Sequence, residues 1–103
     1  MSLNFAELRA ANVRRCNDVF HVLEDWSLSD WGCAMAGEVG EACNLIKKRR
    51  RGEDIDLDTI AEEVADAVIY ADLLLARMDK DLGEAVRAKF NKVSQRRGSK
   101  ICL

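Results

Sequence analysis

The sequence predicts a single all-α domain. The chain has 103 residues, no proline and many residues that favour helices. Its apolar residues recur at helical spacing. A length of about 100 residues is typical of one domain, and no linker or internal repeat is visible, so we treat residues 1–103 as one unit.

The first two of four expected helices are predicted from an apolar stripe and a capping serine. Residues from about 4 to 25 place apolar side chains along one side of a helix. His21, the only histidine, points away from that stripe, which indicates a solvated surface position. Ser27 or Ser29 can cap the second helix, which continues to about Arg50.

The last two helices have boundary signals at both ends. Asp56 can cap a third helix that continues to about Met78. Asp81, with Glu84 three residues later, has the form of a capping box at the start of a fourth helix. This fourth helix is expected to end before Gly98.

The third helix is expected to be central, because it is apolar on two sides. One stripe comprises Leu57, Ile60, Ala61, Val64, Val68, Ala71 and Leu75. Ile69, Tyr70 and Leu73 form a second stripe roughly opposite. A chain of four helices has few neighbours with which to cover both sides, so we expect another copy of the chain to cover one of them.

The composition argues against several partners and locations. A formal charge of −2 makes nucleic acid an unexpected partner. No uncharged stretch approaches the roughly 20 apolar residues that a membrane span needs. The polar, acidic start of the chain is unlike a secretion signal, and the spacing of the four cysteines matches neither a disulfide framework nor a zinc site. We therefore expect a cytoplasmic protein with reduced thiols.

Two pairs of carboxylates interrupt the apolar sides of the second and third helices. Glu38 lies in the middle of the stripe that Trp31 begins, and Glu41 follows one turn later. Glu63 and Asp66 form the second pair, on the side of Ile69 and its apolar neighbours. A single pair of this kind is usually a solvated face, but two pairs embedded in apolar stripes are much less expected.

Pairing these two sides would bring four carboxylates into one partly buried cleft. A nominal charge of −4 there is tolerable only beside a cation, and no Lys or Arg lies next to the acids on these faces. Because all the donors are oxygens, the sequence predicts Mg²⁺, or Mn²⁺, rather than zinc.

These residues resemble the motif of the MazG-type all-α nucleoside triphosphate pyrophosphohydrolases, in their compact single-domain branch. The resemblance covers about residues 22–98 and rests on Glu38-x-x-Glu41 followed after 21 residues by Glu63-x-x-Asp66. The flanking segments that share it are Trp31-Gly-Cys-Ala-Met-Ala-Gly, Asn44 with Lys47 and Lys48, Glu-Val-Ala-Asp-Ala-Val-Ile-Tyr70, and Lys89-Phe-Asn91.

The resemblance implies a four-helix MazG-like chain that assembles as a homodimer or tetramer. The implied reaction is Mg²⁺-dependent hydrolysis of a (deoxy)nucleoside triphosphate to the monophosphate and pyrophosphate, with Glu38, Glu41, Glu63 and Asp66 as metal ligands in a catalytic site. Water would attack phosphorus in line, so that no histidine or nucleophilic serine is required. One carboxylate could instead act as the base that orients this water.

Candidate substrate contacts lie on both sides of the acids. Asn44 and Lys48 follow Glu41 along the acid side of the second helix and could reach the outer phosphates. By resemblance, Lys89 and Asn91 are the phosphate candidates of the fourth helix. Trp31 could wall a base-binding pocket that Trp26 closes from the connecting loop, and ordinary core tryptophans are the alternative.

Two other functions are compatible with the sequence. The first is a phosphoribosyl-ATP or dUTP-type pyrophosphohydrolase on the same scaffold, since those enzymes share paired acids. The second is a non-catalytic helical interaction module, whose acids are solvated and whose apolar sides serve a partner. A panel of nucleotide substrates and the dependence on Mg²⁺ distinguish these functions.

Overall fold

The computed structural model describes residues 2–103, which contain helices and no strand. In chain order the elements are α1 (Phe5–Arg15), a π-helical turn η1 (Cys16–Phe20), a 3₁₀ turn η2 (Leu23–Asp25), α2 (Leu28–Arg50), α3 (Leu57–Arg77) and α4 (Leu82–Arg97). The all-α class is therefore confirmed, and so are the expected second, third and fourth helices.

The N-terminal caps of α2, α3 and α4 form at residues that the sequence analysis predicted. Ser27, and not Ser29, caps α2: its Oγ accepts from the Asp30 N–H at 3.1 Å, and its own N–H donates to Asp30 Oδ2 at 2.9 Å. Asp56 caps α3, and Asp81 caps α4 by accepting from the Glu84 N–H at 2.9 Å.

The first helix differs from the prediction because its regular part ends ten residues early, at Arg15. The His21 N–H donates to the Cys16 carbonyl at 3.0 Å, five residues back, which defines the π turn. The Asn17 side chain then accepts from the Leu23 N–H at 2.8 Å and so stabilises the irregular connection to α2. Side-chain capping by Asn17 thus replaces the helical hydrogen bonds that the apolar spacing predicted.

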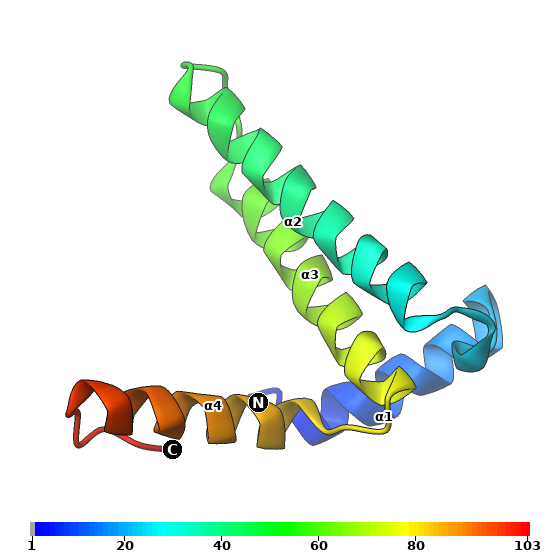
Figure 1. Cartoon of the computed structure of the whole chain (residues 1–103). Helices are drawn as coiled ribbons and strands as arrows, with labels where there is room; N and C mark the ends of the chain where they lie inside the picture. The colour runs from blue at the N-terminus through cyan, green and yellow to red at the C-terminus, as the bar shows by residue number, and fades with distance from the viewer. Residues whose placement is uncertain (1) are drawn as a thin grey trace.

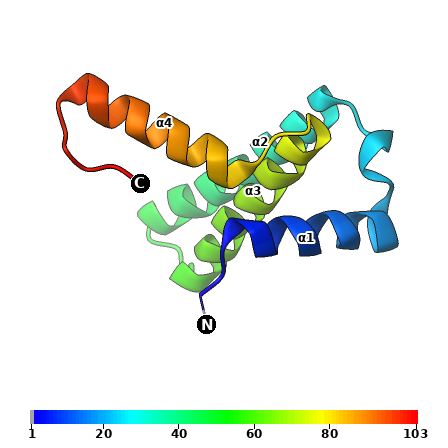
Figure 2. The same cartoon turned by 90° about the horizontal axis from the view of Figure 1, so that it is seen from below.

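The antiparallel pair of α2 and α3 forms a long arm (Figure 1). Around the base of this arm lies a small core, in which Cys16, Leu23, Trp31 and Leu73 are buried. α1 crosses the base beside α3, whereas α4 projects away from the arm and contacts the rest of the chain near its own start (Figures 1 and 2).

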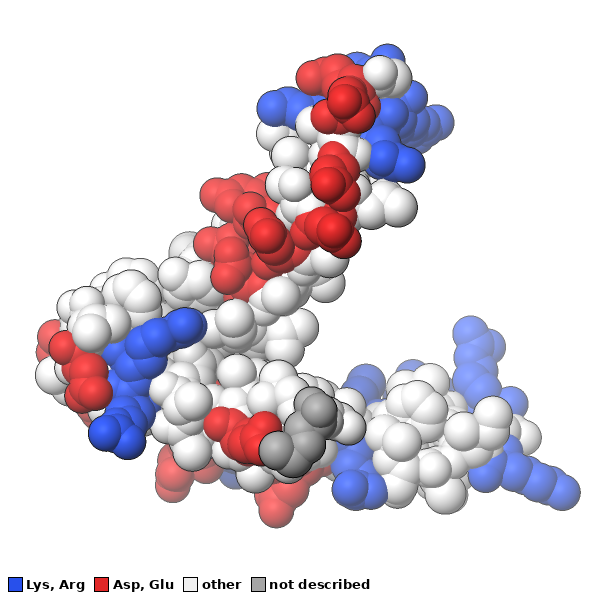
Figure 3. Space-filling view, turned by 180° about the vertical axis from the view of Figure 1, so that it is seen from behind, with Lys and Arg blue, Asp and Glu red and all other residues white. Residues whose placement is uncertain are grey.

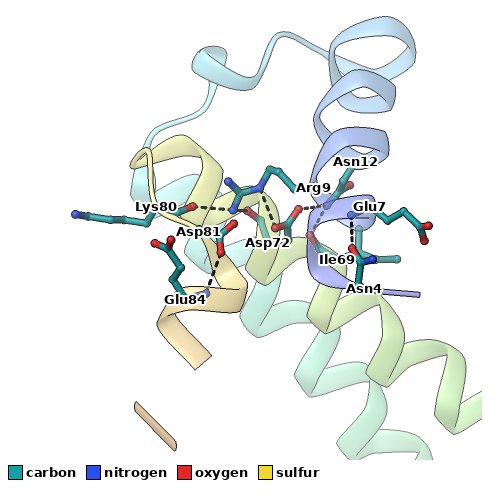
Figure 4. Close-up of polar contacts among 9 residues, drawn as sticks. All are labelled: Asn4, Glu7, Arg9, Asn12, Ile69, Asp72, Lys80, Asp81 and Glu84. Atoms are coloured by element: carbon teal, nitrogen blue, oxygen red, sulfur yellow. Dashed lines mark hydrogen bonds and ion pairs between the residues drawn. The ribbon is translucent and has the colours of Figure 1, made fainter. Parts of the chain in front are cut away.

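A buried polar network attaches α1 to α3 (Figure 4). Asp72 on α3 is fully buried; its Oδ1 accepts from Arg9 Nε at 2.9 Å and its Oδ2 from Asn12 Nδ2 at 3.0 Å. Arg9 also donates to the Lys80 carbonyl at 2.7 Å, and Asn12 to the Ile69 carbonyl at 2.9 Å. Both Asp72 oxygens are thus partnered, as a buried charge requires.

The single chain leaves much apolar surface uncovered. Its radius of gyration is 16.0 Å, whereas a compact domain of this length has about 13 Å. Leu57, Val64 and Val68, all from the first predicted stripe of the third helix, are exposed at 60%, 50% and 41%. The opposite stripe is covered within the chain, since Leu73 is buried and Ile69 and Tyr70 are half-buried.

Among residues 2–103, no helix combines the length and the apolar character that crossing a membrane requires.

Candidate metal centre and adjoining aromatic cavity

Three carboxylates from α2 and α3 converge on the arm. Glu38, Glu41 and Glu63 each offer one oxygen, and these three oxygens lie within 4.8 Å of one another. Glu38 and Glu63 are half-buried and Glu41 is exposed. Figure 3 shows acidic side chains gathered along the middle of the arm, whereas basic side chains gather at its tip and on α4.

The mutual repulsion of these carboxylates changes their titration. The pKa of Glu63 is raised to about 7, first because its protonated form can share the proton with Glu41, and further by desolvation and the charges of Glu41 and Glu38. The pKa of Glu38 is also raised, first by desolvation and then by the charges of Glu41 and Asp66. Without a bound cation, Glu63 is therefore partly protonated near neutral pH.

The donor set fits a hard divalent cation. Glu63 Oε2 is buried and, when all carboxylates are ionised, has no hydrogen-bond partner among residues 2–103. Mg²⁺ binds oxygens at about 2.1 Å, which places two of its ligand oxygens about 3 to 4 Å apart. The three oxygens lie within 4.8 Å of one another, so small side-chain movements would bring them to such separations, and a cation would satisfy the buried oxygen.

Asp66, the fourth predicted ligand, lies beside the cluster but outside the converging group of three. Its charge contributes to the raised pKa of Glu38, so the two carboxylates are neighbours. Asp66 also lines a cavity of about 320 Å³ at the base of the arm. It therefore stands between the acidic cluster and this cavity.

Five aromatic rings line the cavity, those of Phe20, His21, Trp26, Trp31 and Tyr70, and they include both predicted base-binding residues. The ring centroids of Trp26 and Trp31 are 4.6 Å apart, and Tyr70 lies 6.2 Å from Trp31. The pKa of the Tyr70 hydroxyl is raised, first by burial and then by the charges of Glu38 and Asp66, so it stays neutral at physiological pH. Trp31 is 1% exposed and belongs to the core as well as to the cavity wall.

His21 lies in this aromatic wall and not on the solvated surface that the sequence predicted. Its ring centroid is 4.4 Å from that of Trp26 and 5.3 Å from that of Trp31. The π turn is the cause: a hydrogen bond across five residues brings Cys16 and His21 to the same cavity, which a regular helix would not do. The only signal for this turn in the sequence was Asn17, because asparagine side chains readily form hydrogen bonds to nearby backbone groups.

Side chains from three elements hold the connection that carries His21 and Trp26. Asn17 accepts from the Leu23 N–H, and Trp31 Nε1 donates to the Leu23 carbonyl at 3.2 Å. Arg77, at the end of α3, donates through Nε to the Trp26 carbonyl at 2.8 Å. The aromatic wall is thus tied to both helices of the arm.

The four predicted phosphate contacts are not brought together. Asn44 is exposed and Lys48 half-buried, one and two turns beyond Glu41 toward the tip of the arm. Lys89 and Asn91 lie on α4, which projects away from the arm (Figure 1). The Asn91 side chain bonds the backbone of Leu103, accepting from its N–H at 2.8 Å and donating to its carbonyl at 3.1 Å.

Further cavity residues come from α1, which the sequence analysis had not connected with the site. Asn12 and Arg15 line the cavity beside Ile69 and Asp66 of α3. Their places follow from the packing of α1 on α3, for which the sequence offered no local signal.

Comparison of the chain with family models, with curated proteins and with solved structures finds no match.

Proposed function

We propose that this chain is a Mg²⁺-dependent pyrophosphohydrolase that converts a (deoxy)nucleoside triphosphate to the monophosphate and pyrophosphate. The observation that carries this proposal is the convergence of three carboxylate oxygens within 4.8 Å, one of them from a side chain with a buried, unpartnered oxygen. The resemblance to the MazG-type motif supports the same activity from the sequence.

The carboxylates have distinct places in this proposal. Glu38, Glu41 and Glu63 would hold the cation, and Asp66 would complete its environment on the side of the cavity. When bound, Mg²⁺ or Mn²⁺ supplies charge neutralisation of phosphate oxygens and easier ionisation of the attacking water. Without a bound cation, Glu63 can hold a proton near neutral pH because its pKa is about 7, and binding of the cation would displace that proton.

The aromatic cavity would bind the base. Its volume of about 320 Å³ accommodates a flat ring, and stacking on aromatic side chains contributes about 1 to 3 kcal/mol per base. Trp26 and Trp31 would form the stacking walls, with His21 and Tyr70 beside them. Because Asp66 borders both the cavity and the cluster, a base in the cavity would place its phosphates toward the carboxylates.

The decisive experiment compares Glu38→Gln with Glu62→Gln, using pyrophosphate release with Mg²⁺ and with a chelator as the assay. Glu62 is an exposed carboxylate of α3 outside the converging group and serves as the matched control. Glu38→Gln is expected to lower the rate about a hundredfold or more, because it removes a ligand of the catalytic cation. Glu62→Gln should stay within about twofold of the wild type.

The same assay separates the alternatives. Release from phosphoribosyl-ATP or dUTP alone, in a panel of canonical and modified nucleotides, would favour the narrower enzymes on this scaffold. If no nucleotide releases pyrophosphate, Mg²⁺ does not raise the melting temperature and Glu38→Gln stabilises the protein, the chain is a non-catalytic interaction module.

The active form is proposed to be a homodimer or a tetramer. The exposed stripe of α3 and the large radius of gyration support this proposal, because a second copy would cover apolar surface that the single chain leaves exposed. Lys89 and Asn91 would then contact substrate bound to a neighbouring copy, because their own α4 projects away from the carboxylates. A stable monomer in sedimentation experiments at micromolar concentration would contradict this assembly.

A further inference from the structure

Arg15 is a cation at the cavity that forms no ion pair with any of residues 2–103. It is exposed and lines the cavity at the junction of α1 with the π turn. Its guanidinium carbon lies 5.9 Å from the centroid of the Phe20 ring, five residues further on. The π turn thus places an aromatic ring under Arg15, which helps to orient the guanidinium.

The other arginines of this region are already engaged. Arg9 pairs with Asp72, Arg14 lies 3.9 Å from Asp18, and Arg77 bonds the Trp26 carbonyl. Within the part of the chain that the structure describes, Arg15 forms neither an ion pair nor a hydrogen bond through its side chain. Asp66 lines the same cavity, yet the two opposite charges do not pair across it.

We propose that Arg15 binds a phosphate oxygen of a nucleotide whose base occupies the aromatic cavity. This inference rests on the proposed function, since it takes a nucleotide as the ligand. Arg15 is exposed, whereas Trp31 is buried and Trp26 is half-buried, which matches a ligand with a flat apolar ring and an anionic group attached to it.

Electrostatics favour a phosphate at this position. The carboxylate cluster, which Asp66 joins to the cavity, repels phosphates unless a cation is bound there, so a positive side chain at the same cavity would help to hold the phosphate of a nucleotide. The planar guanidinium is the side chain best matched to phosphate, since it donates two parallel hydrogen bonds. Arg15 would therefore supply on α1 the positive charge that α2 and α3 lack around the acids.

The test measures binding without hydrolysis. The probes are the 2′-deoxynucleoside 5′-monophosphates of the four DNA bases and the matching nucleosides, titrated in Mg²⁺ while the fluorescence of Trp26 and Trp31 is recorded. The variants are Arg15→Gln, Arg15→Lys and, as the matched control, Arg14→Gln. Arg14 is the neighbouring exposed arginine of α1 and does not line the cavity.

Arg15→Gln is expected to weaken monophosphate binding by about tenfold or more, because it removes charge-assisted hydrogen bonds. Nucleoside binding should change by less than about twofold. Arg15→Lys should recover part of the loss, and Arg14→Gln should bind like the wild type.

Two results would overturn the inference while leaving the proposed function intact. One is unchanged monophosphate binding in Arg15→Gln, and the other is an equal loss for nucleoside and monophosphate, which would assign Arg15 to the base. If the wild type binds none of the nucleotides, the proposed function fails and this inference fails with it.

Discussion

Removing the Asp72 carboxylate tests how α1 is attached to the arm. In Asp72→Ala, Arg9 Nε and Asn12 Nδ2 lose acceptors at 2.9 and 3.0 Å, and both are left facing the space that the carboxylate filled. Breaking a buried ion pair by removing one partner typically costs about 3 to 5 kcal/mol. Arg9 keeps its bond to the Lys80 carbonyl and is 23% exposed, so we expect the lower part of that range, about 3 kcal/mol.

The assay is urea unfolding followed by circular dichroism, with Asp18→Ala as the control. Asp18 is the carboxylate of an exposed pair at 3.9 Å with Arg14 on the same helical segment, so its removal should cost less than about 0.5 kcal/mol. A difference of less than about 1 kcal/mol between the two variants would refute the view that Asp72 holds α1 against α3.

The double variant Arg9→Met, Asp72→Leu separates the ion pair from simple burial. Asp72→Ala leaves the partly buried Arg9 guanidinium without its carboxylate. If that is why the free energy of unfolding falls, replacing both charges by apolar side chains should recover much of the lost stability. Equal destabilisation of the single and double variants would instead assign the effect to lost packing and to the lost hydrogen bond between Asn12 and Asp72. In either case, a weakened attachment of α1 should also weaken nucleotide binding, since Asn12 and Arg15 line the cavity.

Two further predictions concern the acidic cluster and the exposed face. Because the pKa of Glu63 is raised from 4.5 to about 7, the folded chain holds a proton that the unfolded chain has released, and stability without divalent cations should fall as pH rises from about 4.5 through 7. Glu63→Gln should flatten this fall in thermal melts with a chelator, and a full slope in that variant would contradict the assignment. Val68→Asp, which places a charge at a 41% exposed apolar position, should dissociate the proposed oligomer in sedimentation experiments without unfolding the monomer. An unchanged sedimentation coefficient would exclude this stripe from the interface.

The starts of the second, third and fourth helices were predictable because each depends on residues a few positions apart, whereas the early end of the first helix at Arg15 was not predicted. Ser27 with Asp30, and Asp81 with Glu84, form their caps within one turn, so tertiary packing is not needed to specify them. The choice between Ser27 and Ser29 was not local, since both residues can cap. The spacing of the carboxylates within each helix was equally visible, because residues three apart share a helical face.

The sequence by itself determined an all-helical chain with acidic pairs on two apolar helical sides. Only the tertiary structure decided that Glu38, Glu41 and Glu63 converge while Asp66 borders the cavity, because these positions depend on how α2 packs against α3. It also decided the positions of His21 and Arg15, which follow from one π turn and from the packing of α1 on α3. Helical periodicity fixes which residues share a face, but distances between faces are set by side-chain packing among segments far apart in the chain.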